Sequence, residues 1–537
     1  MSDEPQRPTS TDDRNAWGAC WTAQGMPWRT EPEIDVERQR FLAERRATEP
    51  DMQMGIYPFK DLRLTRADVE WLLSTHESNG MRGPVDWSDP SQRRRDGPNL
   101  SAADLREANL NGLPLARAVL VIAQLQRATL ESGQLQGASL QSALLYGANL
   151  TNAQVQEAVL DDADLQEALL KDAQLAGASL LNAHLQGAMF DNTDMQSAIL
   201  TSSEAQRAFF LCAHLQDAQL SSAELEGASF LNAELQRARL DNAKLHGAFL
   251  DSAHLDGAFL CYAHLQGAFL NLAQLHGAQL TDADLQGTKL VGAGLQGAWL
   301  SGARMDGTTD LADVELDDET RLADVAWHDA PLMHIPWHQA TRLGDESEAR
   351  RHADADGAPK DRQTRLADYA VAVRAYRQLA LALRGQGLHE DADRFAYRAQ
   401  VCQRQVLWRQ ALLPQEGWRI GLSQRLRKLA TYLGSGLLDL ISGYGYRPLR
   451  SFITYALVVV GFAAVYFLLR DSVHPALSPL DSLIFSITSF HGRGFSPGEE
   501  HVGLSNPLTI FAAIEAIIGL LIEITFIATF TQRFFAR

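Results

Sequence analysis

Three of the charged side chains in the apolar C-terminal part of the chain have positions that indicate chemistry with ions. Arg493, Glu515 and Glu523 all follow residue 450, where long uncharged runs begin. A charged side chain at membrane depth is costly, so it is expected to be paired or to face water. Rings of carboxylates favour cations, and rings of arginine favour anions. These residues therefore indicate a path for ions.

No pattern in the sequence indicates catalysis. The chain lacks the G-x-S-x-G elbow, the Walker loop and the dinucleotide fingerprint. The cysteines have neither zinc-site nor disulfide-framework spacing, which favours a reducing cytosol, and they are Cys20, Cys212, Cys261 and Cys402. We therefore predict no enzyme activity, no catalytic or metal-binding residues and no cofactor.

The charge balance and the first residues bear on partners and location. A net charge of −18 argues against a nucleic-acid partner, because phosphate backbones attract Lys and Arg. The opening Met-Ser-Asp-Glu-Pro-Gln-Arg continues without an apolar stretch, so no secretory signal is expected. We expect the N-terminal bulk of the chain to remain in the cytoplasm.

Two membrane spans are expected to position the charged residues. Residues 452–469 and 508–530 are apolar over lengths that cross a bilayer. Basic residues lie outside both spans, at Arg425, Arg427, Lys428, Arg447, Arg450, Arg533 and Arg537. This distribution predicts a multi-pass protein of the cell inner (plasma) membrane with both termini in the cytoplasm. Residues 429–441 are expected to lie along the membrane surface as an amphipathic segment.

The segment between the spans is too short to cross the membrane. Ser478-Pro-Leu-Asp481 opens an apolar stretch that runs to Ile487, and Asp481 suits the first turn of a helix. Hydroxyl groups and backbone carbonyls then follow at Ser486, Thr488, Ser489, Gly492 and Gly494. We expect a re-entrant loop, which is tolerated only where it lines a water-filled path.

Residues 447–537 resemble the two-helix pore domain of potassium-type channels. The filter motif of that family, T-V-G-Y-G, falls on Phe490-His491-Gly492-Arg493-Gly494, where both glycines are kept. Thr488 and Ser489 stand where the family has hydroxyl residues, and Gly519 stands at the hinge glycine of its inner helix. The resemblance implies a homotetramer that conducts ions along its axis.

The departures from the motif bear on selectivity. Without the Thr, Val and Tyr of the filter, we expect non-selective cation conduction first, anion conduction second and potassium selectivity third. Four Arg493 side chains would ring the outer mouth, and we expect each to pair with Glu515. Glu523 is expected to face the cavity and attract cations; the alternatives are hydrogen bonding between subunits or protonation.

The longest feature of the sequence is a five-residue repeat. Every fifth residue from Leu100 to Met305 is apolar and mostly Leu, and Ala mostly stands two residues earlier. A period of five fits neither a helix nor a flat strand, so the chain must turn a corner once per repeat. Positive φ or close backbone approach is expected at Gly227, Gly247, Gly257, Gly267, Gly277, Gly287 and Gly297.

The repeat resembles the pentapeptide-repeat family, whose motif is A-(D/N)-L-x-x. Four repeats form one square coil in that family, which implies about ten coils in a rod about 50 Å long. Histidines that do not recur on every coil favour a structural role over metal binding; they are His184, His214, His254 and His264. Some members mimic DNA and bind topoisomerases, a minor alternative here because the chain continues into membrane segments.

The flanking regions are expected to cover and connect these units. Residues 1–50 are polar and are expected to be mostly disordered, although Trp17, Trp21 and Trp28 could dock. Thr65 and Asp68 predict a capped helix over the open end of the rod. The predicted domains are a polar segment (1–60), a cap (61–98), the β-helix (99–340), a linker (341–363), an α-hairpin (364–412), an interfacial helix (413–450) and the pore domain (451–537).

The predicted architecture is multidomain. It combines a right-handed quadrilateral β-helix, an α-helical hairpin and a two-helix transmembrane pore domain with a re-entrant pore loop. We expect a homotetrameric ion channel in the lipid bilayer, whose cytoplasmic β-helix senses, assembles or binds a protein partner. The alternative is a membrane-anchored interaction scaffold with a non-conducting pore fold.

Overall fold

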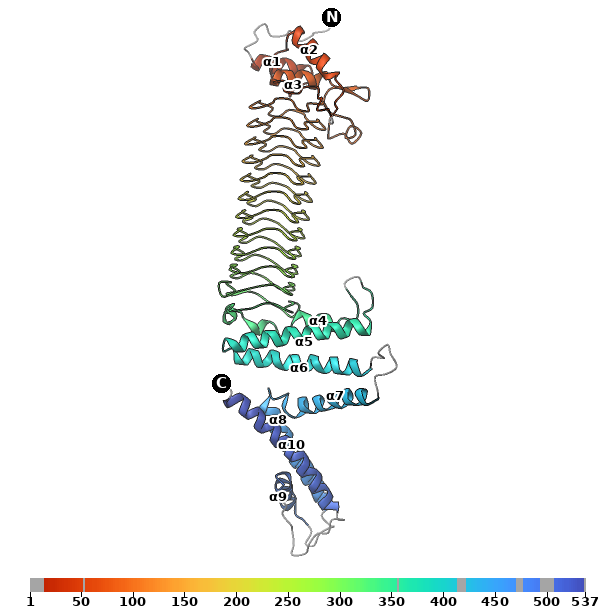
Figure 1. The fold of residues 1–537 in the computed structure, drawn as a ribbon, viewed down its shortest axis with the longest axis vertical. Coiled ribbons are helices and arrows are strands. Elements are labelled where there is room, and N and C mark those ends of the chain that lie inside the picture. The colour runs from red at the N-terminus through yellow and green to blue at the C-terminus, as the bar shows by residue number, and fades with distance from the viewer. Residues whose placement is uncertain are drawn as a thin grey trace. The chain divides into compact units, whose positions relative to one another are not determined.

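The computed structural model describes residues 14–51, 54–354, 357–412, 422–469, 477–492 and 507–535. The chain divides into two compact units, Met1–Gly344 and Asp345–Arg537. The first unit contains a rod of stacked coils, and the second is helical (Figure 1). Each unit is described by itself.

The rod is a β-helix in which one turn takes twenty residues. Parallel bridges join Asn109 to Thr129 and Thr129 to Asn149, and the same spacing holds from Asn99 to Arg304. Backbone hydrogen bonds also link the coils, as from Leu105 N to Gln124 O at 2.8 Å. Four five-residue repeats therefore close one coil, as the family resemblance implied.

The interior of the rod is filled by two residues from each repeat. The central Leu and the Ala two positions earlier are both almost fully buried along the whole rod. Phe190, Phe210 and Phe230 take the Leu position on successive coils, with ring centroids 4.9 and 4.8 Å apart and planes within 3°. This spacing equals the distance between hydrogen-bonded strands, so the side-chain stack and the backbone ladder share one repeat.

Each corner of the rod is a tight turn with one left-handed residue. Ala103 N donates to Leu100 O at 3.2 Å, and Ala102 between them has φ of 57°. A single positive φ at the third position is the signature of a type II turn, which glycine adopts without steric cost. Gly227 has φ of 65° and Gly297 has φ of 68°, so the expected positive φ is confirmed.

The end of the rod departs from the five-residue frame. Lys289 bridges to Asp310 and Arg304 bridges to Ala326, so these coils take one or two extra residues. The irregular coils after Met305 still have a core, because Leu322, Val325 and Trp327 are buried there. Two short 3-10 helices follow, η1 (Leu332–His334) and η2 (Trp337–Gln339).

The start of the first unit is more ordered than expected. Residues 14–50 contain α1 (Arg14–Ala23) and α2 (Val36–Arg46), so the expectation of disorder is wrong for this part. The reason is aromatic burial. Trp17 and Trp21 stack at 5.6 Å and are buried, and the Arg29 guanidinium lies 3.7 Å from the Trp21 ring centroid.

A capped helix meets the first coil of the rod. The predicted capping box is confirmed at the start of α3 (Arg66–Ser74), where Thr65 and Asp68 exchange hydrogen bonds. Leu64 N donates to Asp104 O at 3.0 Å, and Arg66 Nη1 donates to Asn111 O at 3.0 Å. A two-stranded hairpin of β1 (Glu77–Ser78) and β2 (Met81–Arg82) follows.

The second unit is built from helices. The predicted α-hairpin is present as α5 (Arg362–Gly385) and α6 (His389–Leu412), and Gly387 lies in the turn between them with φ of 80°. A short helix, α4 (Gly344–Arg350), precedes them. The remaining helices are α7 (Leu422–Ser442), α8 (Pro448–Leu468), α9 (Pro479–Phe490) and α10 (Pro507–Phe535).

Neighbouring phenylalanines in the rod provide a test of the inward packing. Phe210→Ala removes the middle ring of the stack and should lower the free energy of unfolding by about 3–5 kcal/mol. Phe209 is 46% exposed, so Phe209→Ala should change it by less than about 0.5 kcal/mol. Denaturant unfolding followed by circular dichroism measures both. Equal losses in the two variants would contradict the assigned register.

Candidate functional site

The candidate site lies where α9 meets α8 and α10. α9 begins with a complete capping box, in which Ser478 caps the Asp481 amide and the Asp481 carboxylate accepts from the Ser478 amide. Its 12 residues span about 18 Å, too short for a bilayer core of about 30 Å. The predicted short helix after Ser478 is therefore present.

Apolar contacts hold α9 between the two long helices. One cluster joins Phe490 of α9 to Val459 of α8 and Ile522 of α10. A second cluster joins Phe485 of α9 to Tyr466 of α8 and Leu508 of α10. The middle and the C-terminal end of the short helix are thus packed against both long helices.

A glycine of α10 receives the end of α9. A Cβ built on Gly519 would lie 2.1 Å from the Phe490 carbonyl oxygen and 3.1 Å from its ring. No side chain fits in that space, so the two helices touch through backbone. The structure shows close packing of Gly519 against Phe490, and the hinge that the channel resemblance implied stays a prediction.

This contact sets the depth at which α9 ends. Gly519 follows the first residue of α10 by twelve positions, which is about 18 Å along the helix axis. If α10 crosses a bilayer, the residues after Phe490 lie well inside its hydrocarbon core of about 30 Å. The last carbonyls of α9 have no helical partner, and the negative end of its dipole lies there.

A buried polar cluster joins all three helices at Glu515. Tyr466 of α8 donates its hydroxyl to Glu515 Oε2 at 2.6 Å. Ser486 Oγ of α9 lies 2.5 Å from Glu515 Oε1 and 2.8 Å from the carbonyl oxygen of Val459. Tyr466, Ser486 and Glu515 are fully buried, so water cannot replace these contacts.

The contacts of Glu515 bear on its predicted partner. Arg493 and Gly494 lie outside the described residues, so the pair between Arg493 and Glu515 stays a prediction. Both carboxylate oxygens of Glu515 already have partners from α8 and α9. An Arg493 side chain would have to join this cluster rather than meet an unpaired carboxylate.

The other predicted acidic residue contacts the filter segment. Glu523 Oε1 pairs with His491 Nδ1, a partner within the chain that the sequence analysis did not include. Both side chains are about two-fifths exposed. Gly492 follows with φ of 65°, the left-handed conformation that glycine accepts readily. The structure thus brings together His491 and Glu523, which are 32 positions apart.

The two hydroxyl residues before the filter segment differ in environment. Thr488 Oγ1 donates to backbone carbonyls of its own helix, at 3.0 Å to Ile484 O and 2.9 Å to Phe485 O. Ser489 is buried. A role of these two hydroxyl groups along a path for ions stays a prediction.

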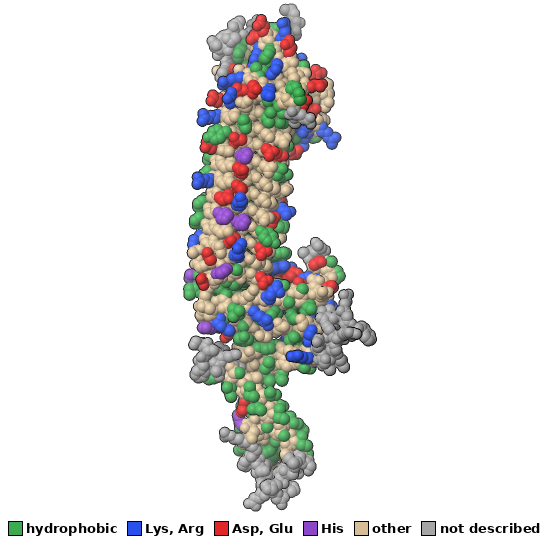
Figure 2. All heavy atoms as spheres, in the orientation of Figure 1, with side chains coloured by type: hydrophobic (Ala, Val, Ile, Leu, Met, Phe, Trp, Pro, Cys, Tyr) green, Lys and Arg blue, Asp and Glu red, His purple; other side chains and the backbone are tan. Residues whose placement is uncertain are grey.

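Apolar side chains cover the outward faces of the long helices. Figure 2 shows hydrophobic side chains gathered over α8 to α10, whereas charged ones are spread over the rod. One row of exposed side chains on α10 recurs every three or four residues, at Ile510, Ile514, Ile517, Leu521 and Ile524, and Leu520, Phe526, Ile527 and Phe530 are exposed as well. Glu515, Gly519 and Ile522 occupy the opposite, buried face. The face of α10 that carries the exposed apolar side chains therefore requires an apolar environment.

An ion-pair network connects α8 to the preceding helices. Asp439 of α7 accepts from Arg404 of α6 at 2.7 Å and from Arg450 of α8 at 3.2 Å. Tyr397 of α6 donates to the same carboxylate at 3.0 Å, and the Arg447 guanidinium lies 4.3 Å from the Tyr397 ring centroid. One carboxylate thus joins the α-hairpin to the start of α8.

Sequence reasoning missed two of these residues. Tyr466 carries a phenol inside an apolar span, and that signal marks it as a potential partner for Glu515. Asp439 is an acidic residue within an otherwise apolar stretch, but its two arginine partners lie 35 and 11 positions away. No short-range pattern links such residues.

Comparison with known proteins supports the interpretation of the rod as a stack of five-residue repeats. The model of the pentapeptide-repeat family matches eight copies, at residues 99–132, 123–162, 163–201, 213–251, 253–292 and 270–307. Together with the twenty-residue coils, this match shows that the chain belongs to the pentapeptide-repeat family through residues 99–307. No curated protein matches the chain.

Several solved structures are similar to the rod. HetL, a pentapeptide repeat protein involved in heterocyst differentiation regulation in Nostoc sp. strain PCC 7120, is 31% identical, with 41% of this chain and 88% of HetL covered and a TM-score of 0.23. Rfr23 from Cyanothece 51142 is 31% identical over 21% of this chain and 65% of its own, with a TM-score of 0.14. A pentapeptide repeat protein from the thylakoid lumen of Arabidopsis thaliana is 25% identical over 28% of this chain and 88% of its own, with a TM-score of 0.11.

The close packing of Gly519 predicts an unusual response to alanine. Alanine normally stabilises a helix by about 1 kcal/mol relative to glycine. Gly519→Ala should instead lower the thermal unfolding midpoint in detergent, because the added Cβ displaces α9. Gly461 of α8 has no atom within 4 Å of an added Cβ, so Gly461→Ala should leave the midpoint unchanged or raise it. A stabilised Gly519→Ala variant would contradict the contact.

Removal of one hydroxyl tests the buried cluster. Tyr466→Phe leaves Glu515 Oε2 without its donor and should lower the free energy of unfolding by about 1–3 kcal/mol. Tyr455 packs its ring 4.8 Å from Phe490, and no hydrogen bond of its hydroxyl is found in the described chain. Tyr455→Phe is the matched control and should be nearly neutral. A neutral Tyr466→Phe would argue against the cluster.

Proposed function

We propose that the chain is an ion channel of the two-transmembrane, potassium-channel-like class, with the pentapeptide-repeat rod in the cytoplasm. The observation that carries the proposal is α9. A capped helix too short to cross a membrane is packed between two helices that are long enough to do so. This order of elements and their mutual packing are those expected of a pore helix between an outer and an inner helix.

The exposure of the long helices supports a membrane location. Leu449–Leu468 and Pro507–Ala528 are apolar enough to span a bilayer, and only 17% of either span is buried within the protein. The core helix of a soluble protein would be mostly buried, and a signal sequence would lie near the N-terminus. The basic residues outside the spans are the basis for proposing the inner membrane with both termini cytoplasmic.

Polar groups at the end of α9 support a water-filled path. His491 and Glu523 meet beyond Phe490, at a depth where lipid could not solvate them. Their partial exposure in the single chain places them at a surface that must adjoin water or another subunit. A homotetramer would gather four such surfaces around one axis, as in the family that residues 447–537 resemble.

The electrostatics of this region favour cations. The negative end of the α9 dipole and the Glu523 carboxylate both lie at the Phe490 end of the helix. We therefore propose the same order of selectivities that the filter sequence indicates: non-selective cation conduction first, anion conduction second and potassium selectivity third. The ring of Arg493 would oppose cations at the outer mouth.

The Asp439 network supports a role for the helical hairpin in gating. Displacement of α6 would act on Arg404 and Tyr397, and through Asp439 on Arg450 at the start of α8. In this proposal the rod senses, assembles or binds a cytoplasmic protein partner, and the hairpin transmits that event to the spans.

A membrane-anchored interaction scaffold is the second candidate. The contact between His491 and Glu523 favours it, because a carboxylate held by its own chain is less available to permeating cations. In that case the pore fold serves as an anchor and an assembly device, and the rod carries the function.

Single-channel recording distinguishes the two candidates. Purified full-length protein in planar bilayers under asymmetric salt should give unitary currents with cation selectivity. Glu523→Gln should lower the cation-to-anion permeability ratio because it removes a negative charge from the path. Arg493→Ala should shift the reversal potential in the cation-selective direction.

A lipid-facing substitution is the control for these recordings. Leu457 of α8 is 68% exposed and lies away from the polar residues, so Leu457→Ala should leave conductance and selectivity unchanged. If the wild-type protein and every variant are folded and assembled but give no current, the channel proposal is overturned and the scaffold is favoured.

A further inference from the structure

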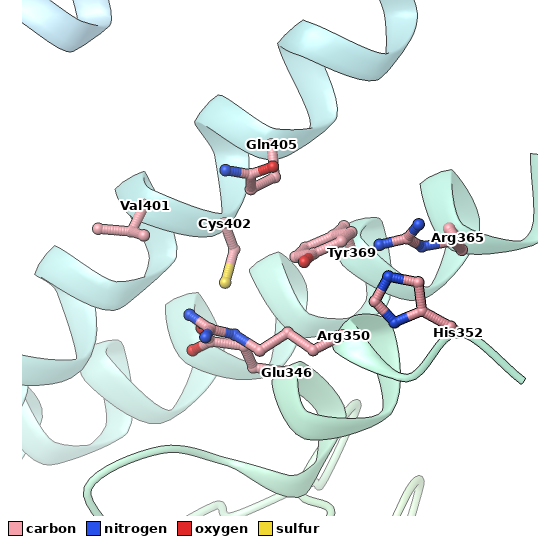
Figure 3. Close-up of a pocket in the computed structure, with 8 residues that line it drawn as sticks. All are labelled: Glu346, Arg350, His352, Arg365, Tyr369, Val401, Cys402 and Gln405. Carbon is pink, nitrogen blue, oxygen red and sulfur yellow. The ribbon is translucent and has the colours of Figure 1, made fainter. Parts of the chain in front are cut away.

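The helical hairpin of the second unit lines a cavity of about 390 Å³ that is open to the surface. Figure 3 shows its lining side chains, which come from α4, from the link after α4, and from facing parts of α5 and α6. The volume lies within the range of small-ligand sites in proteins, roughly 300–1,000 Å³. No role in the proposed channel has been assigned to this cavity.

The one carboxylate in the lining is already neutralised. Glu346 is buried and accepts from Arg350 Nη2 at 2.6 Å on one oxygen. Its other oxygen accepts from Tyr376 at 2.7 Å and lies 3.1 Å from Arg398 Nη2. Two guanidinium groups thus surround one carboxylate, which leaves this side of the cavity positive.

The opposite side of the cavity adds further positive charge. Arg365 of α5 and His352 lie beside the Tyr369 ring (Figure 3). Arg365 forms no ion pair within the described ranges, and its buried Nε has no hydrogen-bond partner there. The nearby carboxylates of Glu348 and Asp368 are held by Lys360, so they do not balance it.

A neighbouring guanidinium shows the effect of this charge. Arg409 of α6 lies 4.3 Å from the Tyr369 ring centroid. The pKa of Arg409 is held below its usual value, mainly by burial and further by repulsion from Arg365. An anion in the cavity would relieve that repulsion.

The cavity is suited to binding rather than to covalent chemistry. Cys402 is its only thiol among the lining residues, and burial, reinforced by the charge of Glu346, raises the pKa of Cys402 far above its usual value. The thiol therefore stays protonated and is a poor nucleophile.

We propose that this cavity binds a small phosphorylated ligand through Arg365, His352 and Arg350. Two guanidinium groups and an imidazole that approach from separate elements match the several oxygens of a phosphoryl group better than the two oxygens of a carboxylate. The aromatic face of Tyr369 and the apolar side chain of Val401 can accommodate the group that carries the phosphate. Binding at this site does not require ion conduction. Because the same hairpin carries Tyr397 and Arg404, a bound ligand would act on the Asp439 network and so on the proposed gating.

Calorimetric titration of the full-length protein tests the site. The probes are inorganic phosphate, pyrophosphate and adenosine monophosphate, with sodium acetate as the carboxylate control, all at fixed ionic strength. At least one phosphate probe should bind saturably with one site per chain. Arg365→Gln should weaken binding by at least about tenfold, because a charge-assisted hydrogen bond is lost.

Arg362 provides the matched control on the same helix. It is exposed and does not line the cavity, so Arg362→Gln should change the affinity less than about twofold. Melting curves without ligand verify that both variants fold. His352→Gln, at an exposed position of the link, provides a second cavity variant if Arg365→Gln is unstable, and it should also weaken binding.

The source of the phosphate is resolved in nanodiscs. Competition of the soluble probe by phosphatidate, but not by phosphatidylcholine, would assign the site to a lipid headgroup; no competition would assign it to a soluble phosphate. The proposal is overturned if no phosphate probe binds saturably, if acetate binds equally well, or if Arg362→Gln and Arg365→Gln weaken binding equally.

Discussion

Satisfaction of the backbone hydrogen bonds is the constraint on which this molecule is built. In the rod, each coil supplies partners for the amides of the next, and this fixes a turn of twenty residues. Where the sequence loses its five-residue frame, the coils lengthen but the ladder continues to Arg304 and Ala326. In the spans the same requirement is met within each helix, which is the arrangement that a bilayer demands.

The ladder of helical hydrogen bonds stops at the end of α9. Its last carbonyls have no helical partners, and the contact between Phe490 and Gly519 holds them at the middle of α10. Polar side chains gather at the same level, with Glu515 tied to α8 and α9 and Glu523 tied to His491. Burial makes the first of these contacts structural, whereas partial exposure leaves the second free to respond to water, ions or a neighbouring subunit.

The α-hairpin carries both the cavity and the ion-pair network of the second unit. One part of the hairpin surrounds a positively charged cavity, and another part holds Asp439 together with Arg450 of α8. Both features use arginine, whose planar guanidinium can serve a carboxylate, an aromatic ring and a phosphate with the same geometry. The net charge of the whole chain is negative, so the overall composition does not indicate this local positive charge.

Local patterns in the sequence determined the repeat, the capped helices and the two apolar spans. Period, capping residues and apolar length each act over a few neighbouring residues, so Leu100, Thr65 and Ser478 predict their elements without tertiary information. The helices near Trp21 escaped prediction because their burial depends on Arg29 and on distant segments. Only the tertiary structure decided that Glu515 meets Tyr466 and that Gly519 receives Phe490, because these contacts join residues 49 and 29 positions apart, whose approach depends on how three helices pack.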